Sequence, residues 1–284
     1  MTAVDAGRAP VVGTGFGARL TEAMDARGPL CVGIDPHAAL LERWGLPDDA
    51  QGARELALRV VEAAAGSVGI VKPQVAFFER FGAAGYAVLE EVIAAARTAG
   101  LLVIADAKRG DVGSTLAAYA AAWLGEGSPL RADAMTAVAF QGLGSLEEAI
   151  AADGGVFVLA ATSNPEGRAL QASRDEAGRT VSAQLVHEVA QRNAAAPGTG
   201  LGDLGVVIGA TRPLAETGID PADLARTPVL APGFGAQGAR LGELEQLFGA
   251  AWPAVIPTVS RSVLGDGADG VRAAIAAHRA ELGR

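Results

Sequence analysis

The sequence from residue 69 to residue 108 reads GIVKPQVAFFERFGAAGYAVLEEVIAAARTAGLLVIADAK. It begins with a short apolar run at 69–74, continues through an amphipathic stretch of helical period at 80–99, and ends in a second apolar run at 101–108. A strand, a helix and a strand at this spacing are typical of a right-handed crossover between two parallel strands.

The same alternation extends in both directions along the chain. Strands are expected at 30–35, 69–74, 101–108, 132–139, 155–163, 205–211, 228–233 and 254–261. Helices are expected at 49–66, 80–99, 114–124, 145–152, 180–193, 212–225, 239–249 and 271–282, with one more at 18–26 before the first strand. Eight strand–helix units in about 255 residues favour a single (β/α)8 TIM barrel with an extra N-terminal helix. The alternative is an open, doubly wound Rossmann-like sheet, but no G-x-G-x-x-G opens a helix after the first strand.

The chain is expected to form one catalytic domain at 15–284, preceded by a frayed segment at 1–14. The polar, turn-rich stretch 164–179 predicts a surface excursion after the fifth strand, and 194–204 predicts a loop before the sixth. Neither stretch has the character of a domain linker.

Composition excludes several classes of protein. The single cysteine, Cys31, allows no internal disulfide, which fits a reducing cytoplasm, and we expect it in the core on the first strand. No segment reaches the roughly 18 apolar residues of a membrane span, and the first ten residues lack the features of a signal peptide. A net charge of -9 argues against a nucleic-acid-binding surface, but not against a small anionic ligand held by a few cations in one cleft.

The distribution of lysine is more informative. The chain has 23 cationic residues, yet only Lys72 and Lys108 are lysines. Codon bias toward arginine explains the scarcity but not the positions, since both lysines fall at the ends of predicted strands. An ammonium group can exchange a proton near neutral pH when its environment is tuned, whereas a guanidinium cannot.

The central motif is Asp106-x-Lys108-x-x-Asp111 at the end of the third predicted strand. Residues two apart in a strand point to one face, so Asp106 and Lys108 should project together into the barrel, where a charge must be paired or functional. The alternatives are a structural ion pair for these two residues and a helix N-cap for Asp111. Function is favoured, because burying one lysine between two carboxylates is a costly way to gain stability.

Other polar residues are expected at the same edge of the barrel. The glycine-rich loop PGFGAQG at 232–238, with Gln237, and Arg261 after the eighth strand together predict a phosphate site. The alternative for Arg261 is a salt bridge on the rim. Asp35 ends the first strand, where it could instead only start a turn before a proline, and the fifth strand ends in Thr162, Ser163 and Asn164.

Several kinds of site are excluded by spacing. The three histidines, His37, His187 and His278, are far apart, no cysteine–histidine pair has zinc-ligand spacing, and no G-x-S-x-G motif is present. No metal site is therefore expected.

Taken together, these residues resemble the orotidine 5'-monophosphate decarboxylase family, in its long-chain bacterial (type 2) branch. The resemblance runs from about residue 28 to the end and is most specific in DAKRGDVGST at 106–115. The stretches GIDPH, IVKPQ, ATSNP, APGFGAQG and VSRSVL support it in the expected order. It implies a lyase of pyrimidine biosynthesis that converts orotidine 5'-monophosphate to UMP and CO2 without a metal or an organic cofactor.

The resemblance also implies roles for the central residues. Lys108 would donate the proton to C6 of the pyrimidine. Asp106 and Asp111 would alternate with Lys72 and Lys108 in a charged tetrad beside the scissile carboxylate. Asp111, and Thr115 on the ribose, would reach the site of the neighbouring subunit in a homodimer.

The same resemblance assigns the substrate-binding residues. Asp35 and Lys72 would hold ribose hydroxyls, Ser163 the pyrimidine, and Gln237 with Arg261 the phosphate. Thr162 is an alternative to Ser163, and the role of Asn164 is left open. Residues 138–144 read VAFQGLG where this branch usually has a motif like V-N-P-Y-L-G, so no contact is assigned to that loop.

Three other functions remain in competition. A magnesium-dependent decarboxylase or aldol synthase on the same barrel would need a second acidic ligand where this chain has Lys72, which a metal ion would repel. A Schiff-base aldolase would use Lys108 as a nucleophile, but flanking carboxylates should raise its pKa. A non-catalytic nucleotide-binding barrel has no need of the complete set of four charged residues, which this chain retains.

Overall fold

The computed structural model describes residues 15–265 and 267–283, so the expected frayed segment at 1–14 lies outside the described residues. Eight parallel strands form a closed barrel in which each strand pairs with the next and β8 pairs with β1. The strands are β1 (Cys31–Ile34), β2 (Ile70–Pro73), β3 (Leu102–Arg109), β4 (Ala134–Ala137), β5 (Gly155–Ala161), β6 (Leu204–Ile208), β7 (Val229–Pro232) and β8 (Val255–Val259). The (β/α)8 prediction is confirmed, and the open Rossmann-like alternative is wrong.

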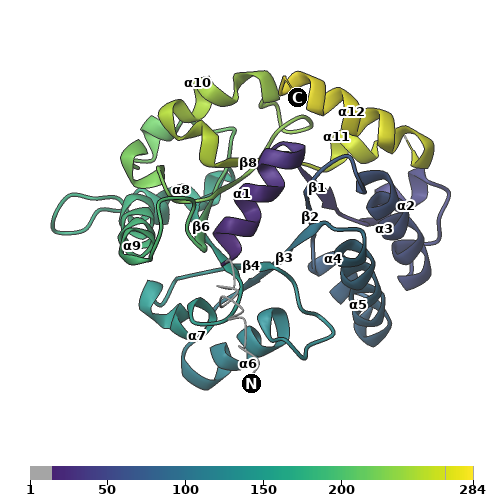
Figure 1. Cartoon of the computed structure of the whole chain (residues 1–284), viewed down its shortest axis with the longest axis horizontal. Coiled ribbons are helices and arrows are strands. Elements are labelled where there is room, and N and C mark those ends of the chain that lie inside the picture. The colour runs from purple at the N-terminus through teal and green to yellow at the C-terminus, as the bar shows by residue number, and fades with distance from the viewer. Residues whose placement is uncertain (1–14, 266, 284) are drawn as a thin grey trace, which may run out of the picture.

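Helices surround the barrel as a ring (Figure 1). The longer ones are α3 (Ala50–Ala64), α5 (Gly82–Thr98), α6 (Gly113–Leu124), α9 (Val181–Ala195) and α12 (Val271–Glu281). Shorter helices are α2 (Ala38–Arg43), α4 (Ala76–Glu79), α7 (Glu147–Ile150), α8 (Arg168–Gln171), α10 (Leu244–Phe248) and α11 (Arg261–Leu264). No described helix is both long and apolar enough to pass through a membrane.

The predicted N-terminal helix is α1 (Phe16–Arg27), and it crosses one end of the barrel (Figure 1). Phe16, Leu20 and Met24 on this helix pack against one inward-facing apolar residue from each strand. These strand residues are Cys31, Ile70, Ile104, Ala134, Phe157, Val207, Leu230 and Ile256. The helix therefore closes the N-terminal end of the barrel, and the opposite end, where the strands finish, is left for a site.

Three predicted helices are shorter than expected, and in one of them, 145–152, only α7 is α-helical and the 3-10 turn η1 (Leu143–Leu146) precedes it. The stretch 212–225 contains two 3-10 turns, η3 (Leu214–Glu216) and η4 (Pro221–Leu224), instead of one helix. Pro213 and Pro221 lack the N–H that a helix interior needs, and Gly218 between them takes a φ of 78°. Similarly, 239–249 contains the 3-10 turn η5 (Leu241–Glu243) followed by the short helix α10.

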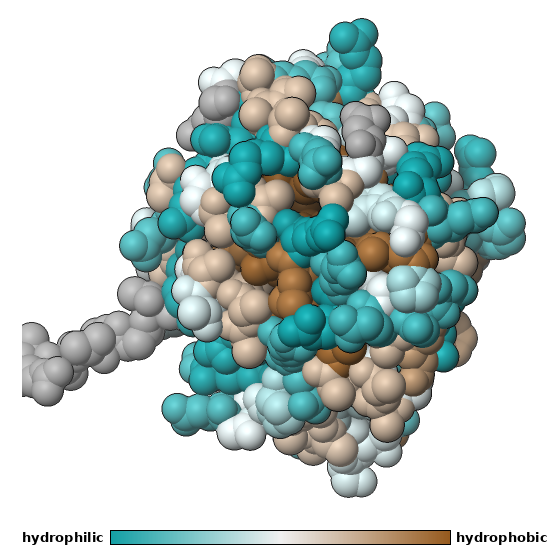
Figure 2. Space-filling view, turned by 90° about the vertical axis from the view of Figure 1, so that its right-hand side faces the viewer, coloured by the Kyte–Doolittle hydropathy of each residue, from teal (hydrophilic) through white to brown (hydrophobic). Residues whose placement is uncertain are grey.

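The outer faces of the helices are polar. Figure 2 shows the side of the molecule on which α2 to α5 lie, where hydrophilic residues are interspersed with apolar ones. Arg54 on α3 donates to Glu91 on α5 across this surface, and Arg59 donates to Glu55 one turn back on α3. Apolar residues between the helices and the strands form the larger of the two cores.

Candidate active site

A cavity of about 310 Å³ opens at the C-terminal ends of the strands. Every strand, or the loop directly after it, contributes to its lining. The charged residues that line it are Asp35, Lys72, Asp106, Lys108 and Arg261. The prediction that both lysines meet at one end of the barrel is therefore confirmed.

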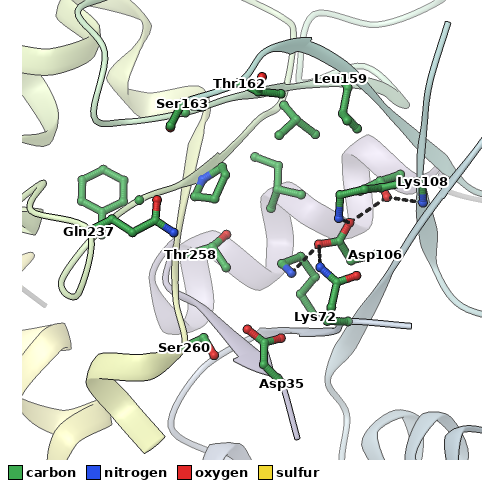
Figure 3. Close-up of a pocket in the computed structure, with 18 of the residues that line it drawn as sticks. Asp35, Lys72, Asp106, Lys108, Leu159, Thr162, Ser163, Gln237, Thr258 and Ser260 are labelled. Atoms are coloured by element: carbon green, nitrogen blue, oxygen red, sulfur yellow. Dashed lines mark hydrogen bonds and ion pairs between the residues drawn. The ribbon is translucent and has the colours of Figure 1, made fainter. Parts of the chain in front are cut away.

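Asp106 lies at the centre of this charged group, with its two oxygens shared among four donors (Figure 3). Lys72 Nζ lies 2.7 Å and Gln74 Nε2 3.0 Å from Oδ2. Lys108 Nζ lies 2.5 Å and Thr136 Oγ1 2.9 Å from Oδ1. A carboxylate accepts about four hydrogen bonds only when it is ionised, so this arrangement fixes Asp106 in its charged form.

Electrostatics agree with that geometry. Burial by itself would raise the pKa of Asp106, but Lys72 and Lys108 outweigh burial and hold the pKa well below its usual range. Burial would likewise lower the pKa of Lys72, but Asp106 and then Asp35 outweigh it and hold the pKa above its usual range. Beneath this pair, burial raises the pKa of the Cys31 thiol to about 12, and the thiol has no part in the charged group's hydrogen bonds.

The two lysines differ in exposure. The side chain of Lys72 is 8% exposed, whereas that of Lys108 is 44% exposed at the same cavity. Lys108 also has a φ of 48°, which makes it the one residue other than glycine with a positive φ in the described part of the chain. Such a conformation is strained and is often found at functional sites.

Next to the charged group, two buried oxygens of residues that line the cavity have no partners. Asp35 Oδ1 and Ser260 Oγ have no hydrogen-bond partner among the described residues, and both residues line the cavity (Figure 3). A turn does begin at Asp35, where the backbone oxygen accepts from the N–H of His37 at 2.8 Å, so the side chain is not needed to form that turn. Buried, unpaired oxygens of this kind are suited to bind hydroxyl groups of a ligand.

The glycine-rich loop after β7 forms another edge of the cavity. Gly233, Gly235 and Gly238 all have φ values in the left-handed region, at 118°, 70° and 106°. Gln237 of this loop lines the cavity together with Arg261, which is exposed and has no ion pair within residues 15–265 and 267–283. The rim salt bridge considered for Arg261 is therefore absent from the described structure, and its guanidinium is available to an anion.

The three polar residues that directly follow β5 differ in whether they line the cavity. Thr162 and Ser163 line the cavity, whereas Asn164 does not belong to its lining. Thr162 Oγ1 donates to Asn164 Oδ1 and accepts from Gln171 Nε2, so its hydroxyl is occupied by local hydrogen bonds. The hydroxyl of Ser163 makes no such bond in the described structure.

Asp111 and Thr115 do not line the cavity of their own chain. Asp111 Oδ1 accepts only from the adjacent backbone N–H of Val112, at 2.8 Å. The N-cap considered for Asp111 is also wrong, because α6 begins at Gly113 with Val112 in the cap position and no capping side chain. The Phe140–Gln141 loop lies outside the cavity as well, and Phe140 is 78% exposed.

Sequence reasoning missed four polar residues of the cavity: Gln74, Thr136, Thr258 and Ser260. Gln74 lies two residues after Lys72, a spacing that places both on one face of a strand, so its position could have been inferred. Thr258 and Ser260 are likewise two residues apart at the end of the eighth predicted strand, whereas Thr136 is the single hydroxyl residue of β4 and carries no comparable signal. In residues 15–265 and 267–283, no group of three or more His, Cys, Asp or Glu side chains is arranged to hold a metal ion.

Comparison with known proteins gives a consistent result. Residues 28–277 match the model of the orotidine 5'-phosphate decarboxylase / HUMPS family. The chain is 54% identical to the orotidine 5'-phosphate decarboxylase of Salinispora tropica, over 93% of this chain and 95% of that protein. It is 51% identical to the one from Streptomyces coelicolor, over 89% and 91% of the two chains.

Solved structures show the same similarity. A crystal structure from Streptomyces avermitilis superposes with a TM-score of 0.89 at 46% identity, covering 99% of this chain and all of that one. The OMP decarboxylase of Leishmania donovani superposes with a TM-score of 0.76 at 33% identity, covering 95% and 98% of the two chains.

Proposed function

Because the chain belongs to the orotidine 5'-phosphate decarboxylase / HUMPS family, it is a lyase that releases CO2 from orotidine 5'-phosphate, and we propose that Lys108 carries the chemistry. The observation that supports this role is the half-exposed ammonium of Lys108 at the cavity, held by a carboxylate that a second, buried lysine also binds. Of the two lysines, Lys108 alone combines exposure to a ligand with a fixed position.

The reaction leaves negative charge on one carbon atom. When the bond between C6 and the carboxylate breaks, its electron pair stays on an sp² carbon that has no conjugated group to accept it. A preorganised cation stabilises such a charge most in a site that excludes water. The Lys108 ammonium provides this cation, then gives a proton to C6, and the neutral amine regains a proton from solvent.

The partners of Lys108 have supporting roles in this proposal. Asp106 orients the ammonium through the contact between Lys108 Nζ and Asp106 Oδ1 at 2.5 Å. Lys72 neutralises the second oxygen of Asp106, so that the carboxylate does not draw Lys108 away from the substrate.

We assign the rest of the substrate to the remaining walls. The phosphate would lie between Gln237 and Arg261, since the Arg261 guanidinium is free of ion pairs in the described structure. The ribose hydroxyls would lie at Lys72 and at the unpaired Asp35 Oδ1, and Ser163 is favoured over Thr162 for the pyrimidine because its hydroxyl is free of local bonds. No metal or organic cofactor is part of this proposal, and the cytoplasm is the proposed location.

We also propose that the active unit is a homodimer with shared sites. Asp111 lies outside its own cavity, next to Val112, whose apolar side chain is 53% exposed. Phe140, after the neighbouring strand β4, is still more exposed, so the segments that follow β3 and β4 each present an apolar side chain that a second copy could cover.

Two assays test these assignments. Following the loss of orotidine 5'-monophosphate absorbance tests the chemistry: Lys108→Ala should lose turnover by more than roughly a thousandfold, with UMP binding within about tenfold of the parent. Turnover equal to the parent's would refute the role of Lys108.

Mixed dimers test the shared site. Lys108→Ala and Asp111→Ala are each expected to be inactive alone. When the two are unfolded and refolded together, half of the dimers should carry one intact site, and about a quarter of the parent activity should return. No recovery, with mixed dimers present, would contradict the contribution of Asp111 to its neighbour.

A further inference from the structure

The register between β3 and β4 changes at the catalytic lysine. Ala105 pairs with Met135 and Arg109 pairs with Ala137, so Asp106, Ala107 and Lys108 lie opposite one residue of β4. That residue is Thr136, which is 1% exposed. A strand with extra residues cannot keep a regular ladder, and its backbone groups need other partners at this point.

We propose that Thr136 is a positioning residue for the decarboxylation, because its hydroxyl holds the backbone and the counter-ion of Lys108 at the same time. The Lys108 N–H donates to Thr136 Oγ1 at 2.9 Å, and Thr136 Oγ1 donates to Asp106 Oδ1 at 2.9 Å. The inference rests on the role of Lys108 proposed above.

These bonds form a closed ring. The oxygen that accepts from Thr136 is Oδ1 of Asp106, the same atom that accepts from the Lys108 ammonium at 2.5 Å. Thr136 is therefore linked to Lys108 at its backbone directly and at its side-chain end through Asp106. The remaining oxygen of Asp106 is held from the other side by Lys72 and Gln74.

The ring explains how a strained backbone is maintained. A left-handed conformation is unfavourable for a lysine, whose Cβ crowds the following carbonyl group. The hydroxyl of Thr136 supplies the acceptor that the displaced N–H of Lys108 needs in place of a β4 carbonyl. Without it, that N–H would lack this partner, and the backbone would be free to relax toward a regular strand, which would carry the ammonium away from Asp106 Oδ1.

The role proposed for Thr136 does not require its hydroxyl to contact the substrate. A threonine hydroxyl has one proton, and Thr136 gives that proton to Asp106. It can act on the reaction chiefly through the two residues it holds. A loss of positioning should therefore lower kcat, whereas a loss of substrate binding would mainly raise KM.

The test compares variants with and without the hydroxyl. Thr136→Val keeps the branched shape, and we expect it to lower kcat by roughly 10–100-fold with KM within about threefold of the parent. Thr136→Ser restores the hydroxyl and should recover most of the lost kcat. Thr98→Val is the matched control, because Thr98 is exposed in the last turn of α5 and its hydroxyl donates to the carbonyl of Ala94.

The outcomes separate this inference from the proposed chemistry. If Lys108→Ala is inactive while Thr136→Val keeps a kcat within threefold of the parent, positioning by Thr136 is wrong. If Lys108→Ala is itself active, the proposed role of Lys108 fails first. If circular dichroism shows that Thr136→Val folds poorly, the comparison uses Thr136→Ser, which keeps the hydroxyl, and Thr136→Ala, which lacks it. A kcat of Thr136→Ser as low as that of Thr136→Ala would overturn the inference. A clearly higher kcat of Thr136→Ser supports it.

Discussion

Replacing Asp106 by asparagine removes one negative charge from between two ammonium groups and changes almost nothing in size. In the parent, Lys72 Nζ and Lys108 Nζ each lie within 2.7 Å of an Asp106 oxygen, and the Lys72 and Asp106 side chains are 8% and 10% exposed. In Asp106→Asn, the buried Lys72 ammonium has no carboxylate of its own chain in contact, and the more distant Asp35 is the one carboxylate of that chain that still raises its pKa.

The magnitude follows from that burial. Removing one partner of a buried ion pair costs about 3–5 kcal/mol, because the other charge stays buried without compensation. For a chain of this length, 1 kcal/mol corresponds to roughly 2 °C in Tm, so we expect Asp106→Asn to melt about 6–10 °C below the parent at pH 7.

On the acid side, the difference in stability should shrink. The pKa of Asp106 is lowered in the folded state, so its ion pairs stabilise the parent above the ordinary value of 3.8, and this contribution is lost as the pH falls through the folded pKa. Asparagine has no such titration. The parent should therefore approach Asp106→Asn in Tm as the pH falls below about 4.

On the alkaline side, the difference should shrink for another reason. In the parent the pKa of Lys72 is raised in the folded state. Its contribution to the free energy of unfolding is therefore fully present below pH 10.5, the ordinary pKa of lysine, and is lost only above that pH. In Asp106→Asn, burial is no longer opposed by Asp106, and the pKa of Lys72 should fall. A lysine with a lowered pKa destabilises at low pH, so Asp106→Asn should gain stability relative to the parent as the pH rises toward 10.5.

Thermal unfolding followed by circular dichroism from pH 3 to pH 10 measures both effects. Asp153→Asn is the matched control, because Asp153 is 79% exposed in its pair with Arg131 and its loss should change stability by less than about 0.5 kcal/mol. A Tm for Asp106→Asn within 2 °C of the parent at pH 7, or a difference independent of pH, would refute this account of the buried charges.

Three further predictions concern the phosphate loop and metal dependence. Arg261→Ala should raise KM for orotidine 5'-monophosphate by roughly 10–100-fold in steady-state assays, because a charge-assisted contact to phosphate is lost; an unchanged KM would place the phosphate elsewhere. Gly235→Ala should raise KM and lower Tm more than Gly45→Ala does. Both glycines have a positive φ, but only at Gly235 would an added Cβ clash with Ser262 Oγ. Equal effects in the two variants would contradict this prediction. Dialysis against a chelator should leave kcat unchanged, and recovery of lost activity by added magnesium would contradict the metal-free site.

The barrel could be predicted from sequence because its main signals are local. Apolar runs and helical periods identify strands and helices, and strict alternation of the two leaves few topologies. The prediction was wrong where Pro213, Gly218 and Pro221 interrupt the stretch 212–225, which an apolar pattern alone describes as a helix. Backbone constraints overrode periodicity there.

The site was predictable to the extent that it depends on strand ends. Lys72 and Lys108 could be placed together because parallel strands finish at one end of a barrel. Thr136 could not be found in this way, since its importance comes from the register shift opposite Asp106 and Lys108. A register shift between two strands is a property of their pairing, and no pattern within either strand specifies it.

The charges around the cavity also explain how an acidic chain attracts an anionic substrate. The cavity is lined by three cations and two carboxylates, so it is locally positive although the whole chain has a net charge of -9. Arg261 is the one of these cations without an ion pair in the described structure, whereas Lys72 and Lys108 are already paired with Asp106. Attraction is therefore concentrated at the proposed phosphate end, and Asp111 from a second copy would make the other end still less positive. Under the proposed assignments, binding energy gained at Arg261 would hold the substrate carboxylate beside Asp106. The departure of neutral CO2 would then remove the repulsion between the two carboxylates and leave Lys108 facing the new charge on C6.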